Sequence, residues 1–222
     1  MIRNIFRLNW IATARMNYCA GGIRAVLRLP IRVYGKLRLH LSGRIILPDT
    51  SPIPTLIIGA EHEDYHATAG CAQICVLGTW RIGGGVQIGP DCFIGVGRNA
   101  SLEMGSGDCF GRNTQIHCSH RILFGQNVFA GEFYATDSTE HQIVRDGVPQ
   151  PLTGEIMVGD ETYMGFRVML LKGCRIPSRS VVASGAVVTK DFCPQGEGLF
   201  LTGVPATVKS TQTRAEKDIC SR

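Results

Sequence analysis

The sequence predicts an all-β fold in which short parallel strands, joined by tight turns, coil into a three-sided β-helix. Three observations predict it: apolar residues recur at every sixth position, small or β-branched residues hold a second fixed position, and 27 glycines are scattered along 222 residues. Glycine at this frequency suits turns in which φ is positive. Repetition of this kind is typical of a stacked architecture, in which each repeat buries its apolar face against the next.

The six-residue repeat is clearest near the C-terminus. From residue 158 the chain reads VGDETY, MGFRVM, LLKGCR, IPSRSV, VASGAV and VTKDFC, and shorter runs begin at residues 82 and 124. Neither a period of 3.6 nor a simple period of 2 accounts for this spacing over so long a span. Three short strands make one triangular coil of about eighteen residues, and coils stack at the strand spacing of about 4.8 Å.

The N-terminal segment, residues 1–48, is strongly basic. It holds nine Lys or Arg and no Asp or Glu, so its formal charge is +9 in a chain of net +5. Apolar residues at helical spacing predict a helix within residues 3–29, interrupted at Gly21 and Gly22. Its arginines recur too often for a transmembrane or signal segment. We expect this segment to pack within an assembly, or to be drawn to a membrane surface or an anionic acceptor.

Three regions follow from these patterns: the basic segment 1–48, with a helix and lead-in strands, a β-helix domain 49–209, and a polar tail 210–222. The six-residue repeat is interrupted at residues 137–157, where the sequence DSTEHQIVRDGVPQPLTGEIM is polar and contains two prolines and two glycines. We expect this stretch to project from the coil as a loop. Loops on rigid scaffolds are where functional residues collect.

The nine cysteines indicate a reducing compartment. Their number is odd, no CxxC pair occurs, and a chain of 222 residues has no need of a disulfide framework. Small buried thiols in a cytoplasmic protein, either free in the cytoplasm or at the inner face of a membrane, fit this usage.

The stretch VGDETYMGFRVMLLKGCRIPSRSVVASGAVVTKDF, followed by GVPATVK, resembles the hexapeptide-repeat acyltransferases. The resemblance covers about residues 75–209 and is greatest to the enzymes that acetylate sugars in surface polysaccharide synthesis. It implies a left-handed coil, which is an exception to the usual right-handed crossover. It further implies acetyl-CoA as donor and a homotrimer as the functional assembly.

The DSTEH segment resembles the family's Asp-Ser-x-x-His motif, in which the histidine is the catalytic base. The resemblance therefore implies this role for His141. Acyl transfer to a hydroxyl needs a base that takes the hydroxyl proton, and histidine titrates near neutrality. Asp137 and Glu140 are the candidates to orient its ring. His117 and His120 are the alternative bases, and a structural role is the other interpretation of each.

The resemblance also implies where the donor binds. Small residues of the C-terminal repeats would leave a groove for the pantetheine arm, and lysines would neutralise phosphate. The predicted donor-binding residues are Tyr163, Gly165, Ala183, Ser184, Gly185, Lys190, Gly203, Pro205 and Lys209. The chain departs from the family pattern at Tyr163, Val204 and Thr207, where the family has Trp, Asn and a basic residue.

The predicted function is direct transfer of an acetyl group from acetyl-CoA to a sugar hydroxyl, in surface polysaccharide synthesis and without a covalent enzyme intermediate. Two alternatives stay open: N-acetylation of a nucleotide amino sugar, and a non-catalytic β-helix scaffold. The same β-helix carries the gamma-class carbonic anhydrases, but the spacing of His117, His120 and His141 does not match their zinc ligands. No metal and no nucleic acid partner is predicted.

Overall fold

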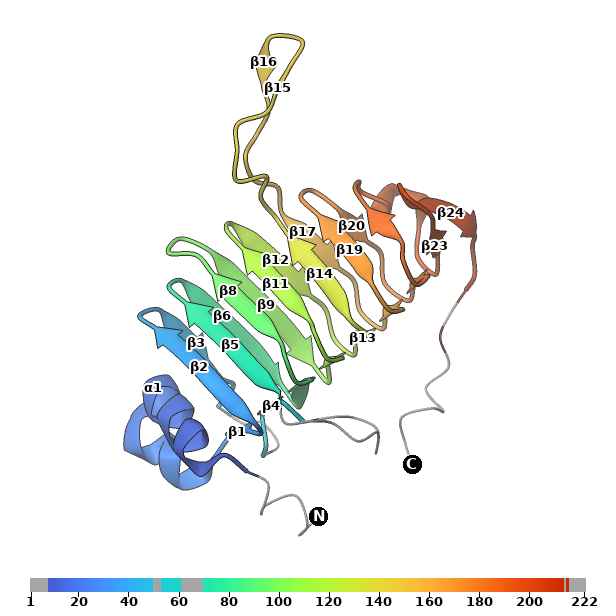
Figure 1. Ribbon diagram of the computed structural model, residues 1–222. Coiled ribbons are helices and arrows are strands. Elements are labelled where there is room, and N and C mark those ends of the chain that lie inside the picture. Colours follow the sequence, from blue (N-terminus) through green and yellow to red (C-terminus); the bar gives the residue numbers. More distant parts are fainter. Residues whose placement is uncertain (1–7, 50–52, 61–69, 214, 216–222) are drawn as a thin grey trace.

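The computed structural model describes residues 8–49, 53–60, 70–213 and 215. Its body is a prism with three walls, each a sheet of parallel strands, and the chain passes through the walls in turn (Figure 1). The fold is a left-handed parallel β-helix with one N-terminal helix, which confirms the predicted fold class.

The three walls are named here by the order in which the chain enters them. The first sheet holds β1 (Ile31–Val33), β4 (Leu56–Ile58), β7 (Val86–Ile88), β10 (Cys109–Phe110), β13 (Phe129–Ala130), β18 (Tyr163–Met164), β21 (Val181–Val182), β23 (Phe200–Thr202) and the antiparallel β24 (Thr207–Ser210). The second sheet holds β2 (Lys36–Leu41), β5 (Cys71–Val76), β8 (Phe93–Val96), β11 (Gln115–Cys118), β14 (Phe133–Thr136), β19 (Val168–Leu171) and β22 (Val187–Val188). The third sheet holds β3 (Arg44–Ile46), β6 (Thr79–Gly84), β9 (Ser101–Ser106), β12 (Arg121–Phe124), β17 (Ile156–Val158) and β20 (Arg175–Ile176).

The interior of the prism is filled by the repeat positions that the sequence singled out. Every first position of the C-terminal hexads is fully buried: Val158, Met164, Leu170, Ile176, Val182 and Val188. The fifth positions are buried as well: Thr162, Val168, Cys174, Ser180 and Ala186. Alternate residues therefore point inward along each short strand, and the small fifth-position residues leave room at the corners of the prism.

The helix α1 (Trp10–Arg28) covers the N-terminal end of the prism (Figure 1). The side chain of Asn9 accepts a hydrogen bond from the Ala12 amide and caps the helix. Backbone angles at Gly21 and Gly22 are non-helical, as their position in the sequence predicted. The buried Asn17 side chain bonds both the amide and the carbonyl of Ile31, which joins α1 to the first strand.

Strands β1, β2 and β3 pair in parallel with β4, β5 and β6. They therefore form the first coil of the same prism, and the boundary predicted at residue 48 falls between two coils of one β-helix. The sequence pattern did not indicate this coil, because apolar and polar residues alternate with a period of two over residues 31–46 and the six-residue repeat is absent there.

Candidate active site

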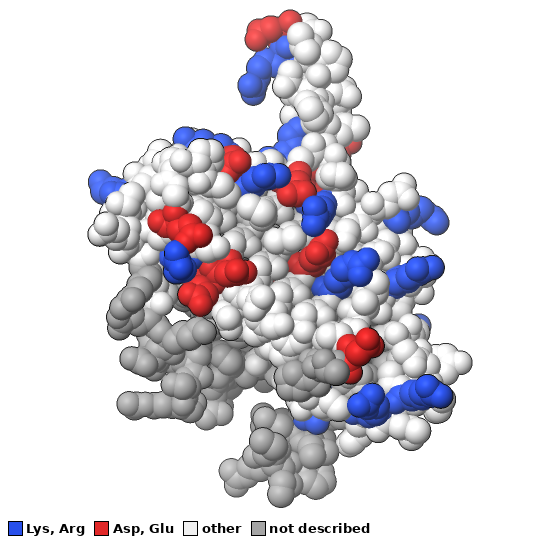
Figure 2. Space-filling model, turned by 180° about the vertical axis from the view of Figure 1, so that it is seen from behind, with Lys and Arg blue, Asp and Glu red and all other residues white. Residues whose placement is uncertain are grey.

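The interrupting loop leaves the prism where the second sheet turns into the third, here called the second–third corner. It runs from the end of β14 to the start of β17 and carries the hairpin β15 (Val144–Arg145) and β16 (Val148–Pro149), which projects well beyond the walls (Figures 1 and 2). Ser138 and Thr153 form an antiparallel bridge at its base, and the Thr139 amide donates to the Leu152 carbonyl at 2.9 Å. The loop is thus an ordered ribbon.

Asp137 anchors the start of this loop. Its side chain is fully buried, and its two carboxylate oxygens accept hydrogen bonds from the amides of Ser119 (2.7 Å) and His120 (2.8 Å) in the preceding coil. A buried carboxylate bonded to two backbone amides holds both segments in one geometry. The predicted bond from Asp137 to the His141 ring is not formed within the single chain, because both oxygens serve the 119–120 turn.

The following coil holds the other side of the loop base. The Gly154 amide donates to the Asp137 carbonyl, and the Gly173 amide donates to the Gly154 carbonyl, both at 2.9 Å. The ammonium group of Lys172 donates to the Pro151 carbonyl. Coils before and after the loop therefore fix its two ends.

His141 lies exposed on the ribbon, between its base and the hairpin. The backbone turns sharply here: the His141 amide donates to the Thr139 carbonyl at 2.6 Å, and Glu140 has a φ of +58°. Within the part of the chain that the structure describes, no group hydrogen-bonds to the His141 imidazole. The imidazole is therefore accessible to a substrate or to another chain at the second–third corner.

His117 lies on the outward face of β11, between two aromatic rings. Its imidazole stacks on Phe93, with ring centroids 4.6 Å apart, and meets Tyr134 at 5.2 Å. Burial lowers the pKa of His117 below its usual 6.5, and the negative charge of Glu140 opposes that shift. Glu140, one residue before His141, thus acts electrostatically on His117.

His120 occupies the turn after β11 and its side chain is exposed. Its amide donates to Asp137, and its carbonyl accepts from the Ser101 amide at 2.9 Å. The backbone of His120 is thus tied directly to the loop that carries His141. The two alternative bases and the predicted base belong to adjacent coils at the same edge of the second sheet.

Most of the predicted donor-binding residues meet at a different edge, where the first sheet turns into the second, here called the first–second corner. Gly165, Ala183, Ser184, Gly185, Gly203 and Pro205 occupy this corner in successive coils. A Cβ at Gly165 would lie 2.5 Å from Ser184 Oγ, so only glycine lets these two coils approach so closely. The Ser184 hydroxyl in turn accepts a hydrogen bond from the Phe166 amide at 3.0 Å. The corner presents small side chains and backbone groups, together with the exposed side chains of Phe166 (62%) and Val204 (72%).

Three other predicted donor residues lie apart from this corner. Tyr163 faces outward from the first sheet and stacks on Phe129, with centroids 5.6 Å apart and the rings nearly parallel. Lys190 lies at the second–third corner, with its ammonium 5.1 Å above the Phe192 ring. Lys209 is exposed in β24. His141 and the first–second corner stand at opposite edges of the second sheet, so one chain does not bring them together.

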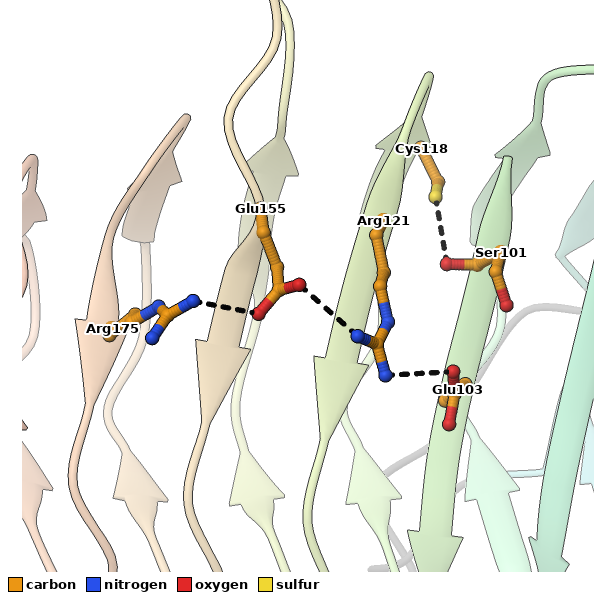
Figure 3. A network of polar contacts seen from close by, with 6 residues as sticks. All are labelled: Ser101, Glu103, Cys118, Arg121, Glu155 and Arg175. Carbon is orange, nitrogen blue, oxygen red and sulfur yellow. Dashed lines mark hydrogen bonds and ion pairs between the residues drawn. The ribbon is translucent and has the colours of Figure 1, made fainter. Parts of the chain in front are cut away.

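The sequence missed an ionic network on the third sheet (Figure 3). Arg121 lies between Glu103 (3.3 Å) and Glu155 (3.2 Å), and Glu155 also pairs with Arg175 at 3.1 Å. These residues come from four successive coils, and Glu155 is where the loop rejoins the wall. The spacing of the coils is the sequence feature that could have predicted these pairs, because Arg121 follows Glu103 by 18 residues and Arg175 follows Glu155 by 20. Positive and negative side chains alternate over the middle of the face seen in Figure 2.

The buried cysteines are not placed as nucleophiles. Burial raises the pKa of the Cys92, Cys118 and Cys174 thiols to about 12, which removes the thiolate at neutral pH. Cys220 lies outside the described residues. Across residues 8–49, 53–60, 70–213 and 215, no three His, Cys, Asp or Glu side chains are grouped so as to hold a metal ion.

Neither a protein-family model nor a curated protein matches the sequence, but solved structures match the fold. The polySia-specific acetyltransferase NeuO is 17% identical with a TM-score of 0.50, over 87% of this chain and 82% of that one. This chain shares its fold with an acetyltransferase. The polysialic acid O-acetyltransferase OatWY is 18% identical with a TM-score of 0.49, over 84% of this chain and 77% of that one. The N-acyltransferase AntD from Bacillus cereus was solved in complex with dTDP and 3-hydroxybutyryl-CoA. It is 11% identical with a TM-score of 0.48, over 85% of this chain and 82% of that one.

Proposed function

We propose that this protein is an O-acetyltransferase that moves an acetyl group from acetyl-CoA to a hydroxyl of a sugar, in a precursor of a surface polysaccharide. The observation that carries the proposal is His141: an exposed imidazole on a loop whose two ends are fixed by the neighbouring coils. The fold shared with NeuO, a protein named as a polySia-specific acetyltransferase, supports the same class of reaction.

His141 removes the proton from the sugar hydroxyl as its oxygen attacks the thioester carbonyl. A carbon–oxygen bond forms, the carbon–sulfur bond breaks, and the proton passes from His141 to the departing CoA sulfur. Backbone amides at a glycine turn stabilise the negative charge that develops on the carbonyl oxygen. The high pKa of the buried cysteines is consistent with transfer that needs no acyl-cysteine intermediate.

The donor occupies the first–second corner in this proposal, where Gly165, Ala183 and Gly185 leave small-residue surfaces and Gly203 and Pro205 form the last turn. Because this corner and His141 lie at opposite edges of the second sheet, the complete site needs two chains. A homotrimer with threefold symmetry places the loop of each subunit against the corner of the next. Glu140 and the exposed His120 then border the acceptor.

The test is acetyl transfer from acetyl-CoA to a panel of sugars, nucleotide sugars and oligosaccharides, followed by mass spectrometry because the native thiols react with thiol dyes. His141→Ala is expected to lower kcat by about 10²- to 10⁴-fold, the range for loss of a general base. CoA binding, measured by calorimetry, should not change. His40→Ala is the matched control, since it removes an exposed imidazole from β2 in the first coil; His120→Ala tests the alternative base.

Equal turnover by wild type and His141→Ala would remove His141 from the mechanism, and a loss on His120→Ala instead would assign the base there. If the wild type does not bind CoA, the proposed acetyltransferase activity is refuted and a non-catalytic scaffold is favoured. An acetylated amine in place of a hydroxyl would assign N-transfer to a nucleotide amino sugar.

A further inference from the structure

The helix α1 presents an unpartnered apolar face at the N-terminal end of the prism. Its inner side packs against the first coil through Ala12, Met16 and the buried Asn17. Its outer side carries large apolar residues that are between 53% and 84% exposed: Trp10, Ile11, Tyr18, Ile23 and Leu27. Ile11 and Tyr18 are seven residues, about two helical turns, apart on the same side, and Ile23 and Leu27 are about one turn apart after the Gly21–Gly22 kink. We call these five residues the α1 outer face.

Every charged residue of α1 itself is positive. Arg15, Arg24 and Arg28 are exposed on the same helix, and residues 1–48 include no Asp or Glu. Trp and Tyr are the residues that favour the boundary between lipid headgroups and acyl chains, and arginine pairs with lipid phosphate. A helix with exposed apolar residues, interfacial aromatics and arginines as its only charged side chains has the composition of an interfacial amphipathic helix.

The second half of α1, after the kink, does not enter the core of the prism. From Ile23 to Arg28 no residue is buried, although the first half has four buried residues. No helix among the described residues is long and apolar enough to cross a membrane. The geometry of α1 suits a helix that lies along a surface.

We propose that the α1 outer face docks onto an anionic lipid bilayer, with the end of the prism toward the membrane. The apolar side chains enter the boundary of the acyl chains, and Arg15, Arg24 and Arg28 meet anionic headgroups. A second copy of the chain is the less favourable occupant, since packing α1 against α1 would bring arginines of like charge together. This inference does not depend on acetyl transfer.

The test is sedimentation of the full-length protein with vesicles of phosphatidylcholine alone and of phosphatidylcholine mixed with phosphatidylglycerol. We expect binding to the anionic vesicles that weakens as salt rises. Replacing Ile11→Ser together with Leu27→Ser should lower the partition coefficient by about tenfold or more, since each serine removes a buried aliphatic group. Arg24→Gln with Arg28→Gln should also lower it.

The matched control is Arg81→Gln with Arg98→Gln, which removes two exposed arginines from the prism wall and should leave vesicle binding unchanged. All these side chains are exposed, so unfolding temperatures stay close to that of the wild type, and transfer to a water-soluble acceptor is unaffected. The proposal is overturned if the wild type does not bind anionic vesicles or if the α1 variants bind as well as the control. It is equally overturned if the α1 variants change only the oligomeric mass measured by light scattering.

Discussion

At the residue scale, the buried carboxylate of Asp137 fixes the base of the loop that carries His141. Asp137 and Glu140 are the two candidates to orient the His141 ring, and in the single chain the carboxylate of Asp137 bonds the amides of Ser119 and His120 instead. Those partners are 17 and 18 residues away, a distance set by coil stacking, which no local pattern reveals. The influence of Glu140 on the pKa of His117 has the same origin.

Asp137→Asn tests this anchoring role. Asparagine keeps one carboxamide oxygen but turns its NH₂ toward a backbone amide that is also a donor. We expect a loss of about 1 to 3 kcal/mol in the free energy of unfolding, the cost of leaving a buried donor unsatisfied. Urea unfolding measures it, and kcat should fall because the loop base loosens.

The matched control for this change is Asp146→Asn, at the exposed turn of the hairpin, where a φ of +51° is one that asparagine tolerates well. The control should unfold like the wild type. If Asp137→Asn is as stable as Asp146→Asn, the carboxylate does not hold the loop base.

At the element scale, the repeat predicted the C-terminal coils because one position in six is buried and aliphatic. It did not predict the first coil, where β1 to β3 lack the repeat, nor the conformation of several corners. Glu161, Arg167 and Arg179 have φ between 55° and 61°, although none is a residue type that favours positive φ. Stacking of one coil on the next imposes these angles, and a single sequence carries no signal for them.

Coil stacking also explains glycines whose φ is not positive. A Cβ on Gly105, at the end of β9, would overlap the carbonyl oxygen of Gly125 in the next coil. We therefore expect Gly105→Ala to lower the free energy of unfolding by about 1 to 3 kcal/mol, the usual cost of overpacking. Urea unfolding checks this, with Gln115→Ala on an exposed strand position as control. Equal stability of the two variants would show that the coils separate at no cost.

At the scale of the whole molecule, the prism separates the two halves of the proposed site. His141 stands at the second–third corner, and the small-residue surface proposed to bind CoA lies at the first–second corner. The sequence motifs named both sets of residues but gave no indication that one wall of the prism lies between them. We therefore propose that each complete site takes its base from one subunit and its donor surface from the next.

Mixing two inactive variants tests this claim most directly. His141→Ala lacks the base, and Ala183→Trp fills the donor corner, so each homotrimer should be inactive. If the two chains are co-refolded in equal amounts, about one quarter of the subunit boundaries pair an intact loop with an intact corner. We expect acetyl transfer to return to about a quarter of the wild-type rate per subunit. Mixed trimers that stay as inactive as their parents would contradict a site shared between subunits.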